Sequence, residues 1–85
     1  MAERALMKNR TVAIADIYVP AKRRLTLDPA KVEPLAQSIL EKGLENPILV
    51  RPDGQRYVLV EGLHRLEACK SLGETKIACL FVQAR

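Results

Sequence analysis

The chain has 85 residues, of which 48% are hydrophobic, and this suffices for one small domain. It contains no apolar run as long as a signal peptide or a membrane span requires, so we expect a cytoplasmic protein with no membrane partner. Cys69, Cys79 and the single histidine, His64, do not have the spacing of metal ligands. We therefore expect no metal held by protein side chains, and we expect both cysteines to be buried free thiols.

The formal net charge of +4 arises in the N-terminal quarter of the chain. Residues 1–24 contain six Lys or Arg residues but only two Asp or Glu residues. Such a surplus attracts phosphate groups, although a solvated charged tail explains it equally well. We expect residues 1–9 to be disordered. If DNA binds, we expect weak, non-specific contacts, because no groove-reading element is visible. The candidate DNA contacts are Arg4, Lys8, Arg10 and Lys22.

The first predicted elements are a strand, a loop and the start of a helix. Residues 11–17 are rich in β-branched side chains, which predicts a strand. Residues 20–24 are polar and basic, which predicts a loop. Asp28 followed by Pro29 is typical of a helix start, because the carboxylate can cap the helix and proline suits its first position.

The predicted helix continues to Gly43, because apolar residues recur at helical spacing from Val32 to Leu40. Gly43 can end it in the left-handed conformation that often follows a helix. Pro34 disagrees with this pattern, since it lacks a backbone N–H. We therefore expect either a kinked first turn or a regular helix that begins near Pro34.

The remaining pattern predicts a β-hairpin, a helix and a strand. Residues 48–51 and 57–60 flank a turn sequence, residues 63–72 have a helical pattern, and residues 76–82 are apolar enough for an interior strand. This order predicts an α+β fold. We expect a single small domain over residues 10–85, with a short mixed sheet, a β-hairpin and two packed helices.

Gly62 lies at a predicted strand-to-helix turn, where converging backbone N–H groups and the helix dipole favour an anion. Arg65 lies within the arc of apolar residues on the following helix, so its guanidinium must meet a carboxylate or an anion. His64 lies on the edge of that arc, free to donate to the same anion. The alternative is that Arg65 merely pairs with Glu61 or Glu67, and these residues alone leave both interpretations open.

Three segments, in their order and spacing, resemble the ParB N-terminal domain and the related sulfiredoxins. They are LDPAKVEPLAQSILEKGLENPILV, YVLVEGLHRLEACKSLG and IACLFV, and the resemblance covers about residues 16–83. It implies that the predicted α+β domain is ParB/sulfiredoxin-like and that its ligand is a nucleoside triphosphate, CTP or ATP, with Mg2+.

In ParB-like domains the corresponding turn reads Gly-Glu-Arg-Arg and contacts the triphosphate, and the arginine of an upstream Pro-Arg motif, which precedes a Phe-Asp pair, supplies a further contact. Gly62 and Arg65 match the turn, and Arg24 matches the upstream arginine. The nucleotide-binding residues that the resemblance implies are Gly62, Leu63, His64, Arg65, Arg24 and Arg23.

This sequence also departs from both patterns. Leu63 and His64 replace the glutamate and the first arginine of the ParB-like turn, and Arg23 replaces a proline. The sulfiredoxin turn reads Gly-Cys-His-Arg, with the cysteine as nucleophile, and Leu63 takes its place. Because leucine has no nucleophile, we do not expect sulfinic acid reductase activity, and we identify no catalytic residue.

We interpret the chain as a nucleotide-binding module that acts in DNA maintenance, in partition or its regulation. Two alternatives remain open: a small nuclease or ATP-dependent enzyme of the same fold, and a protein-binding adaptor that has lost the ligand. Whether the chain is an enzyme stays open: slow nucleotide hydrolysis or nuclease activity would favour the first alternative. No residue is diagnostic of the base, and nothing in the sequence identifies a partner protein.

Overall fold

The structure, a computed structural model, describes residues 9–44 and 46–82. It contains a five-stranded sheet with the order β1-β5-β3-β4-β2. The elements are β1 (Arg10–Ala13), the 3-10 helix η1 (Ile14–Asp16), β2 (Ile17–Tyr18), α2 (Ala21–Arg24), α3 (Pro29–Lys42), β3 (Ile48–Asp53), β4 (Arg56–Glu61), α4 (Leu63–Ser71) and β5 (Lys76–Phe81). None of the helices in these two ranges is long and apolar enough to cross a membrane.

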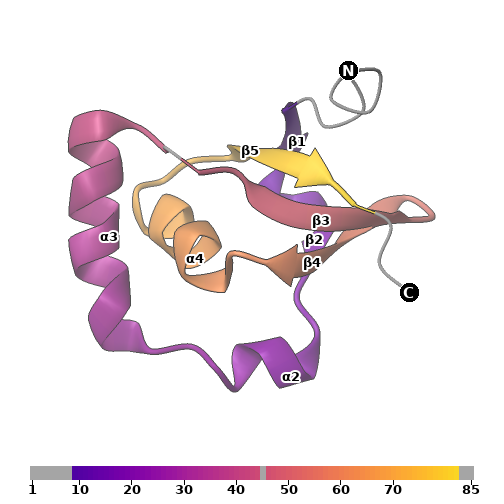
Figure 1. The fold of residues 1–85 in the computed structure, drawn as a ribbon, viewed down its shortest axis with the longest axis horizontal. Helices are drawn as coiled ribbons and strands as arrows, with labels where there is room; N and C mark the ends of the chain where they lie inside the picture. Colours follow the sequence, from indigo (N-terminus) through magenta and orange to yellow (C-terminus); the bar gives the residue numbers. More distant parts are fainter. Residues whose placement is uncertain (1–8, 45, 83–85) are drawn as a thin grey trace.

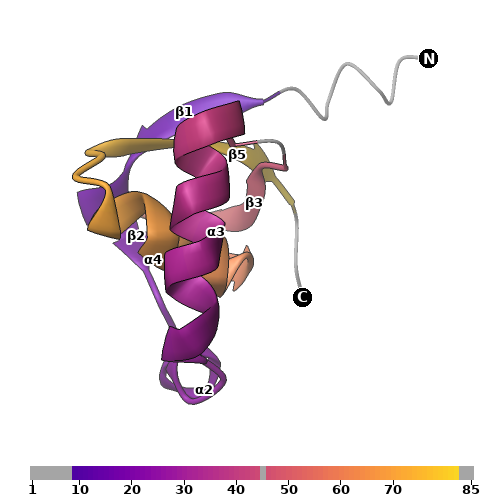
Figure 2. The ribbon, with the colours of Figure 1, turned by 90° about the vertical axis from the view of Figure 1, so that its left-hand side faces the viewer.

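The sheet is mixed, and α4 lies between it and α3 (Figures 1 and 2). Strand β3 pairs antiparallel with β4 and parallel with β5. Ile48 and Val50 of β3, Leu59 of β4 and Leu66 of α4 are at most 2% exposed. The core therefore lies between the central strands and α4. The α+β class, the hairpin and the interior position of the last strand are as the sequence predicts.

The prediction of one strand over residues 11–17 is wrong. Strand β1 pairs with β5 at one edge of the sheet, whereas β2 pairs with β4 at the opposite edge. The chain must therefore pass from one edge to the other, and η1 makes that passage, where Ile14 N–H donates to the carbonyl of Thr75 at 2.9 Å. The residues between β1 and β2 therefore do not stay extended, because the two strands must pair at opposite edges of the sheet, and this outweighs their local preference for a strand.

The predicted loop at residues 20–24 instead contains α2, a single helical turn. The carbonyl of Pro20 accepts from the N–H groups of Arg23 and Arg24 at 2.9 and 3.1 Å. Proline suits the start of such a turn because its φ is already fixed near the helical value. This turn adds a third α-helix to the two that were predicted. Figure 1 shows it at the end of the molecule opposite β1.

Helix α3 begins at Pro29, as predicted, and Asp28 Oδ1 accepts from Ala30 N–H at 3.1 Å. It does not begin near Pro34, which lies inside the helix. Pro34 removes the hydrogen bond to the carbonyl of Ala30, but both residues are exposed. Water can therefore take the place of the missing donor, which makes an interior proline tolerable here.

Gly62 joins β4 to α4 with a φ of 112°, and it lies directly against β3. A Cβ atom at this position would be 2.6 Å from Cγ2 of Ile48 and 2.9 Å from its Cβ. Glycine is therefore required both by the left-handed dihedral angle and by the close approach to a fully buried side chain.

We predict that Gly62→Ala lowers the free energy of unfolding by about 3 kcal/mol, from roughly equal contributions of dihedral strain and overpacking. The matched control is Gly54→Ala in the hairpin turn. Gly54 has a φ of 64°, but a Cβ there would have no neighbour within 4 Å, so it should lose only about 1 kcal/mol. Urea denaturation measures both, and equal losses would contradict the packing argument.

Cys69 and Cys79 are buried free thiols, as predicted. Burial raises the pKa of the Cys69 thiol above its ordinary value of 9.0, and the negative charge of Glu74 adds to this. Burial also raises the pKa of the Cys79 thiol, although Arg10 opposes the shift. The fold therefore favours the protonated form of both thiols.

A thiol whose pKa is higher in the folded than in the unfolded state stabilises the fold fully below its ordinary pKa, and this contribution is lost as the pH rises through the folded value. We therefore predict that unfolding stability falls more steeply between about pH 8 and pH 10 in the natural chain than in a Cys69→Ala, Cys79→Ala variant. Urea denaturation at several pH values gives the free energy of unfolding of each protein. If this free energy changes equally with pH in both proteins, burial leaves the pKa values of the thiols unperturbed.

Candidate functional site

The first turn of α4 provides backbone donors at the position that the sequence predicts. Gly62 is the N-cap residue, and no side chain among residues 9–44 and 46–82 caps this helix. Leu66 N–H donates to the carbonyl of Gly62 at 2.9 Å, closing the first turn. The preceding N–H groups have no partner within an α-helix, and they lie at the positive end of the helix dipole. Residues 62–65, here called the Gly62 turn, can therefore bind an anion.

His64 is not free, because it connects α4 to the start of α3. Its Nε2 atom accepts a hydrogen bond from Asp28 N–H at 3.0 Å. An accepting Nε2 carries no proton, so the ring proton of the neutral side chain lies on Nδ1. The side chain can donate to an anion through Nδ1, or through Nε2 once the contact with Asp28 is broken.

The guanidinium of Arg65 donates to backbone carbonyls, whereas the sequence predicts a carboxylate or an anion as its partner. Its Nη1 donates to the carbonyls of Asn46 and Pro47 at 3.1 and 2.7 Å. Glu67, one of the carboxylates considered for it, is paired instead with Lys70 at 3.3 Å. One terminal nitrogen of the half-buried guanidinium is thus bound to the segment that enters β3.

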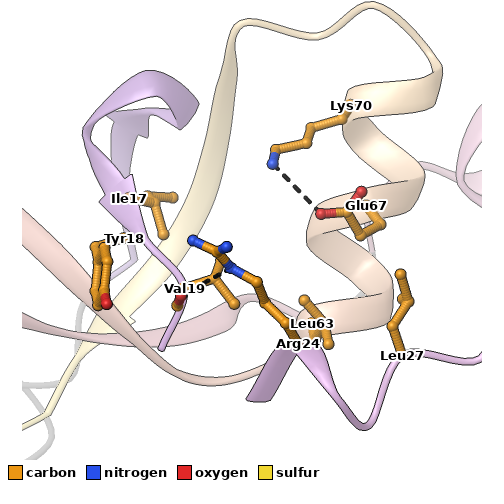
Figure 3. A pocket seen from close by; sticks show the side chains of 8 residues that line it. All are labelled: Ile17, Tyr18, Val19, Arg24, Leu27, Leu63, Glu67 and Lys70. Atoms are coloured by element: carbon orange, nitrogen blue, oxygen red, sulfur yellow. Dashed lines mark hydrogen bonds and ion pairs between the residues drawn. The ribbon is translucent and has the colours of Figure 1, made fainter. Parts of the chain in front are cut away.

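A hollow of about 300 Å³ opens beside the Gly62 turn, between β2, α2 and α4. Figure 3 shows Arg24 reaching across it, with Nε donating to the carbonyl of Val19 at 3.2 Å. The Glu67–Lys70 pair lies on the α4 side of the hollow. Its lining residues are Ile17, Tyr18, Val19, Arg24, Leu27, Leu63, Glu67 and Lys70.

Two of the predicted nucleotide-binding residues, Arg24 and Leu63, therefore line one hollow. Gly62, His64 and Arg65 lie within two residues of Leu63 in the chain but do not line the hollow. Arg23 is exposed on α2 and also lies outside the lining. The hollow thus combines an apolar wall with the cation of Arg24 and the Glu67–Lys70 ion pair.

Glu67 and Lys70 are not among the site residues predicted from the sequence, although Glu67 was a candidate partner of Arg65. A signal for them was present, because Leu63, Glu67 and Lys70 follow the i, i+4, i+7 spacing that places residues on one face of a helix. No comparable signal marks Tyr18, which reaches the hollow only because β2 pairs with β4.

The candidate DNA contacts are not gathered in one place. Arg10 is exposed on β1 and its guanidinium carbon lies 5.2 Å from the centre of the Phe81 ring. Lys22 is exposed on α2, at the opposite end of the molecule in both views (Figures 1 and 2). Arg4 and Lys8 lie outside the described residues. Within residues 9–44 and 46–82, no three His, Cys, Asp or Glu side chains are grouped so that they could hold a metal ion.

Comparisons with known proteins agree with this architecture. The ParB N-terminal domain family model matches residues 2–85. The probable chromosome 1-partitioning protein ParB of Deinococcus radiodurans is 41% identical over 58 residues, which cover 68% of this chain and 20% of that protein. The chain thus spans about a fifth of the length of such a relative.

Two solved structures are similar over most of the chain. Sulfiredoxin from Arabidopsis thaliana has a TM-score of 0.80 and 31% identity, covering 91% of this chain and 86% of that one. The C-terminally truncated chromosome-partitioning protein ParB from Caulobacter crescentus, complexed with CTP-gamma-S, has a TM-score of 0.79 and 29% identity, covering 92% of this chain and 46% of that one. The match to the family model over residues 2–85 shows that the chain belongs to the ParB N-terminal domain family.

Proposed function

We propose that this domain binds a nucleoside triphosphate, CTP or ATP with Mg2+, and acts in chromosome or plasmid partition. The phosphates would bind at the Gly62 turn, with Arg24 approaching from α2. The similarity to a ParB that was solved with CTP-gamma-S supports a nucleotide as ligand. A partition role also fits the cytoplasmic location that the sequence predicts.

The observation that carries the proposal is the uncapped start of α4 beside a hollow with basic side chains. Backbone N–H groups at a helix N-terminus bind phosphate without needing a particular side chain. The hollow next to them has a volume of about 300 Å³ and is lined by both Arg24 and Lys70. Backbone donors, a guanidinium and an ammonium together provide the donors that a polyphosphate requires.

The observed orientation of the Arg24 side chain allows its guanidinium to bind a phosphate without moving. Its Nε is bonded to the carbonyl of Val19, and Figure 3 shows the terminal nitrogens facing into the hollow. That bond fixes the direction of the guanidinium, which reduces the loss of side-chain entropy when a ligand binds. Lys70 is less available, because binding must compete with its ion pair to Glu67.

We predict that Arg24→Ala weakens nucleotide binding by roughly ten- to a hundredfold, because a charge-assisted contact contributes about 1.5–3 kcal/mol. His64→Ala should have a smaller effect, since the ring also contacts Asp28. Calorimetric titration with each of the four ribonucleoside triphosphates and Mg2+ measures these changes.

The matched control is Lys42→Ala, which removes an exposed cation at the far end of α3. Arg56 is unsuitable as a control, because its guanidinium lies 4.3 Å from the centre of the Tyr18 ring at the hollow. Equal affinities in the natural chain and Arg24→Ala would remove Arg24 from the site. Turnover of the nucleotide would favour the enzyme alternative, and absence of binding to the natural chain would favour the adaptor.

We further propose that any contact of this domain with DNA is weak and independent of sequence. If Arg4, Lys8 and Arg10 contribute three phosphate contacts, log affinity should fall with log salt concentration with a slope of about −3. Fluorescence anisotropy with two unrelated duplexes checks both points. Nanomolar, sequence-dependent binding that survives added salt would contradict the proposal.

A further inference from the structure

We propose that Glu67 selects ribonucleotides, because its carboxylate accepts hydrogen bonds from the ribose hydroxyl groups of a nucleotide whose phosphates lie at the Gly62 turn. This inference rests on the proposed function, since it places the nucleoside relative to the phosphates bound there. It assigns the hollow beside the turn to the ribose and the base, and it gives a role to a residue that is not among the site residues predicted from the sequence.

Glu67 lies in the hollow, one helical turn beyond the start of α4. Leu63 and Glu67 are four residues apart on α4 and both line the hollow, so Glu67 is about 6 Å further along the helix axis. In a nucleoside triphosphate the ribose directly follows the phosphate chain. A nucleotide that is held by its phosphates at the start of α4 and extends into the hollow therefore brings its ribose to Glu67.

The ion pair with Lys70 orients the carboxylate and leaves it able to accept further hydrogen bonds. Lys70 Nζ donates to Oε2 of Glu67 at 3.3 Å, and Figure 3 shows the pair on the α4 side of the hollow. The two oxygens of a carboxylate have about four acceptor positions in total. The side chain of Glu67 is 30% exposed, so a ligand can reach it. Glu67 can therefore keep its contact with Lys70 and accept from two neighbouring hydroxyl groups.

The charge of Glu67 determines which part of the ligand it can face. Glu67 is the one acidic side chain among the described residues that line the hollow. A carboxylate repels phosphate oxygens, which carry the same charge, and it has no proton to donate to them. A ribose hydroxyl group is a donor, and its hydrogen bond to a charged acceptor is stronger than one to a neutral acceptor. Glu67 therefore favours a nucleotide bound with its sugar in the hollow and its phosphates at the turn.

The rest of the hollow suits the apolar faces of a sugar and a base. Its volume of about 300 Å³ is at the lower end of the range for small-molecule sites. Its apolar and aromatic lining residues are Ile17, Tyr18, Val19, Leu27 and Leu63. Such a wall contributes affinity but discriminates weakly, whereas a group that accepts from a ligand hydroxyl rejects an analogue without it. Discrimination between ribose and a sugar that lacks these hydroxyl groups therefore depends on the carboxylate.

The test combines a change in the protein with a change in the ligand. Glu67→Ala removes the acceptor, whereas Glu67→Gln keeps the size of the side chain and one carbonyl oxygen but removes the charge. Glu33→Ala is the control, because it removes an exposed carboxylate of α3 that does not line the hollow. The ligands, each with Mg2+, are CTP and ATP, the 2′,3′-dideoxy counterpart of each, and inorganic tripolyphosphate. Calorimetric titration measures each affinity.

We expect the natural chain to bind CTP or ATP about tenfold or more tightly than the dideoxy counterpart, because two charge-assisted hydrogen bonds are lost with the hydroxyl groups. In Glu67→Ala the two ligands should bind within about twofold of each other, and in Glu67→Gln the difference should be intermediate. Affinity for tripolyphosphate should not fall in either variant, because the carboxylate faces the sugar. Glu33→Ala should discriminate as the natural chain does.

Three outcomes would overturn the inference and leave the proposed nucleotide site in place. Equal affinities of the natural chain for a ribonucleotide and its dideoxy counterpart would show that the hydroxyl groups are not recognised. Unchanged discrimination in Glu67→Ala would assign their recognition to another residue. If Glu67→Ala lost as much affinity for tripolyphosphate as for the ribonucleotide, the carboxylate would act through Mg2+ or the phosphates. Failure of the natural chain to bind any of these ligands would refute the proposed function, and the inference with it.

Discussion

The contact between the backbone of Gly62 and the side chain of Ile48 determines how the helical layer meets the sheet. Ile48 pairs with Cys79 in the parallel β3–β5 ladder, so it belongs to the centre of the sheet. Gly62 can rest on it only because it has no Cβ. The start of α4, and with it the N–H groups of the Gly62 turn, is therefore fixed to the most buried part of the domain.

Helix α3 depends on this arrangement indirectly. Only Ala36 of α3 is buried, and the helix packs mainly against α4 (Figures 1 and 2). His64 holds its N-terminal end through Asp28, and Arg65 holds the segment that follows its C-terminal end. His64 and Arg65 both belong to the first turn of α4. The position of α3 and the geometry of the anion site therefore depend on the same turn.

Local signals in the sequence were sufficient for much of the fold. Asp28 and Pro29 marked the start of α3, and the turn residues marked the hairpin, because capping and turn formation depend on a few neighbouring residues. The separation of β1 from β2 was not predictable in this way. It depends on pairing with β5 and β4 at opposite edges, which lie more than 35 residues away in the chain. The same long-range pairing brings Tyr18 to the hollow.

The candidate site was predicted in its backbone but not in its side-chain contacts. A glycine between a strand and a helix indicated the turn, and the turn is present. The carbonyl partners of Arg65 lie 18 and 19 residues away, and the partner of His64 lies 36 residues away. No periodicity reports such contacts, because a backbone carbonyl or N–H group carries no residue-specific signal.

The most direct test of the account is an amide NMR titration of this chain with CTP and Mg2+. If phosphates bind at the start of α4, the largest shifts should occur at the amides of Leu63, His64 and Arg65, with smaller shifts at Arg24. The same amides should respond to inorganic tripolyphosphate. Shifts confined to the β3–β4 hairpin, or no shifts at saturating nucleotide, would contradict a phosphate site at the Gly62 turn.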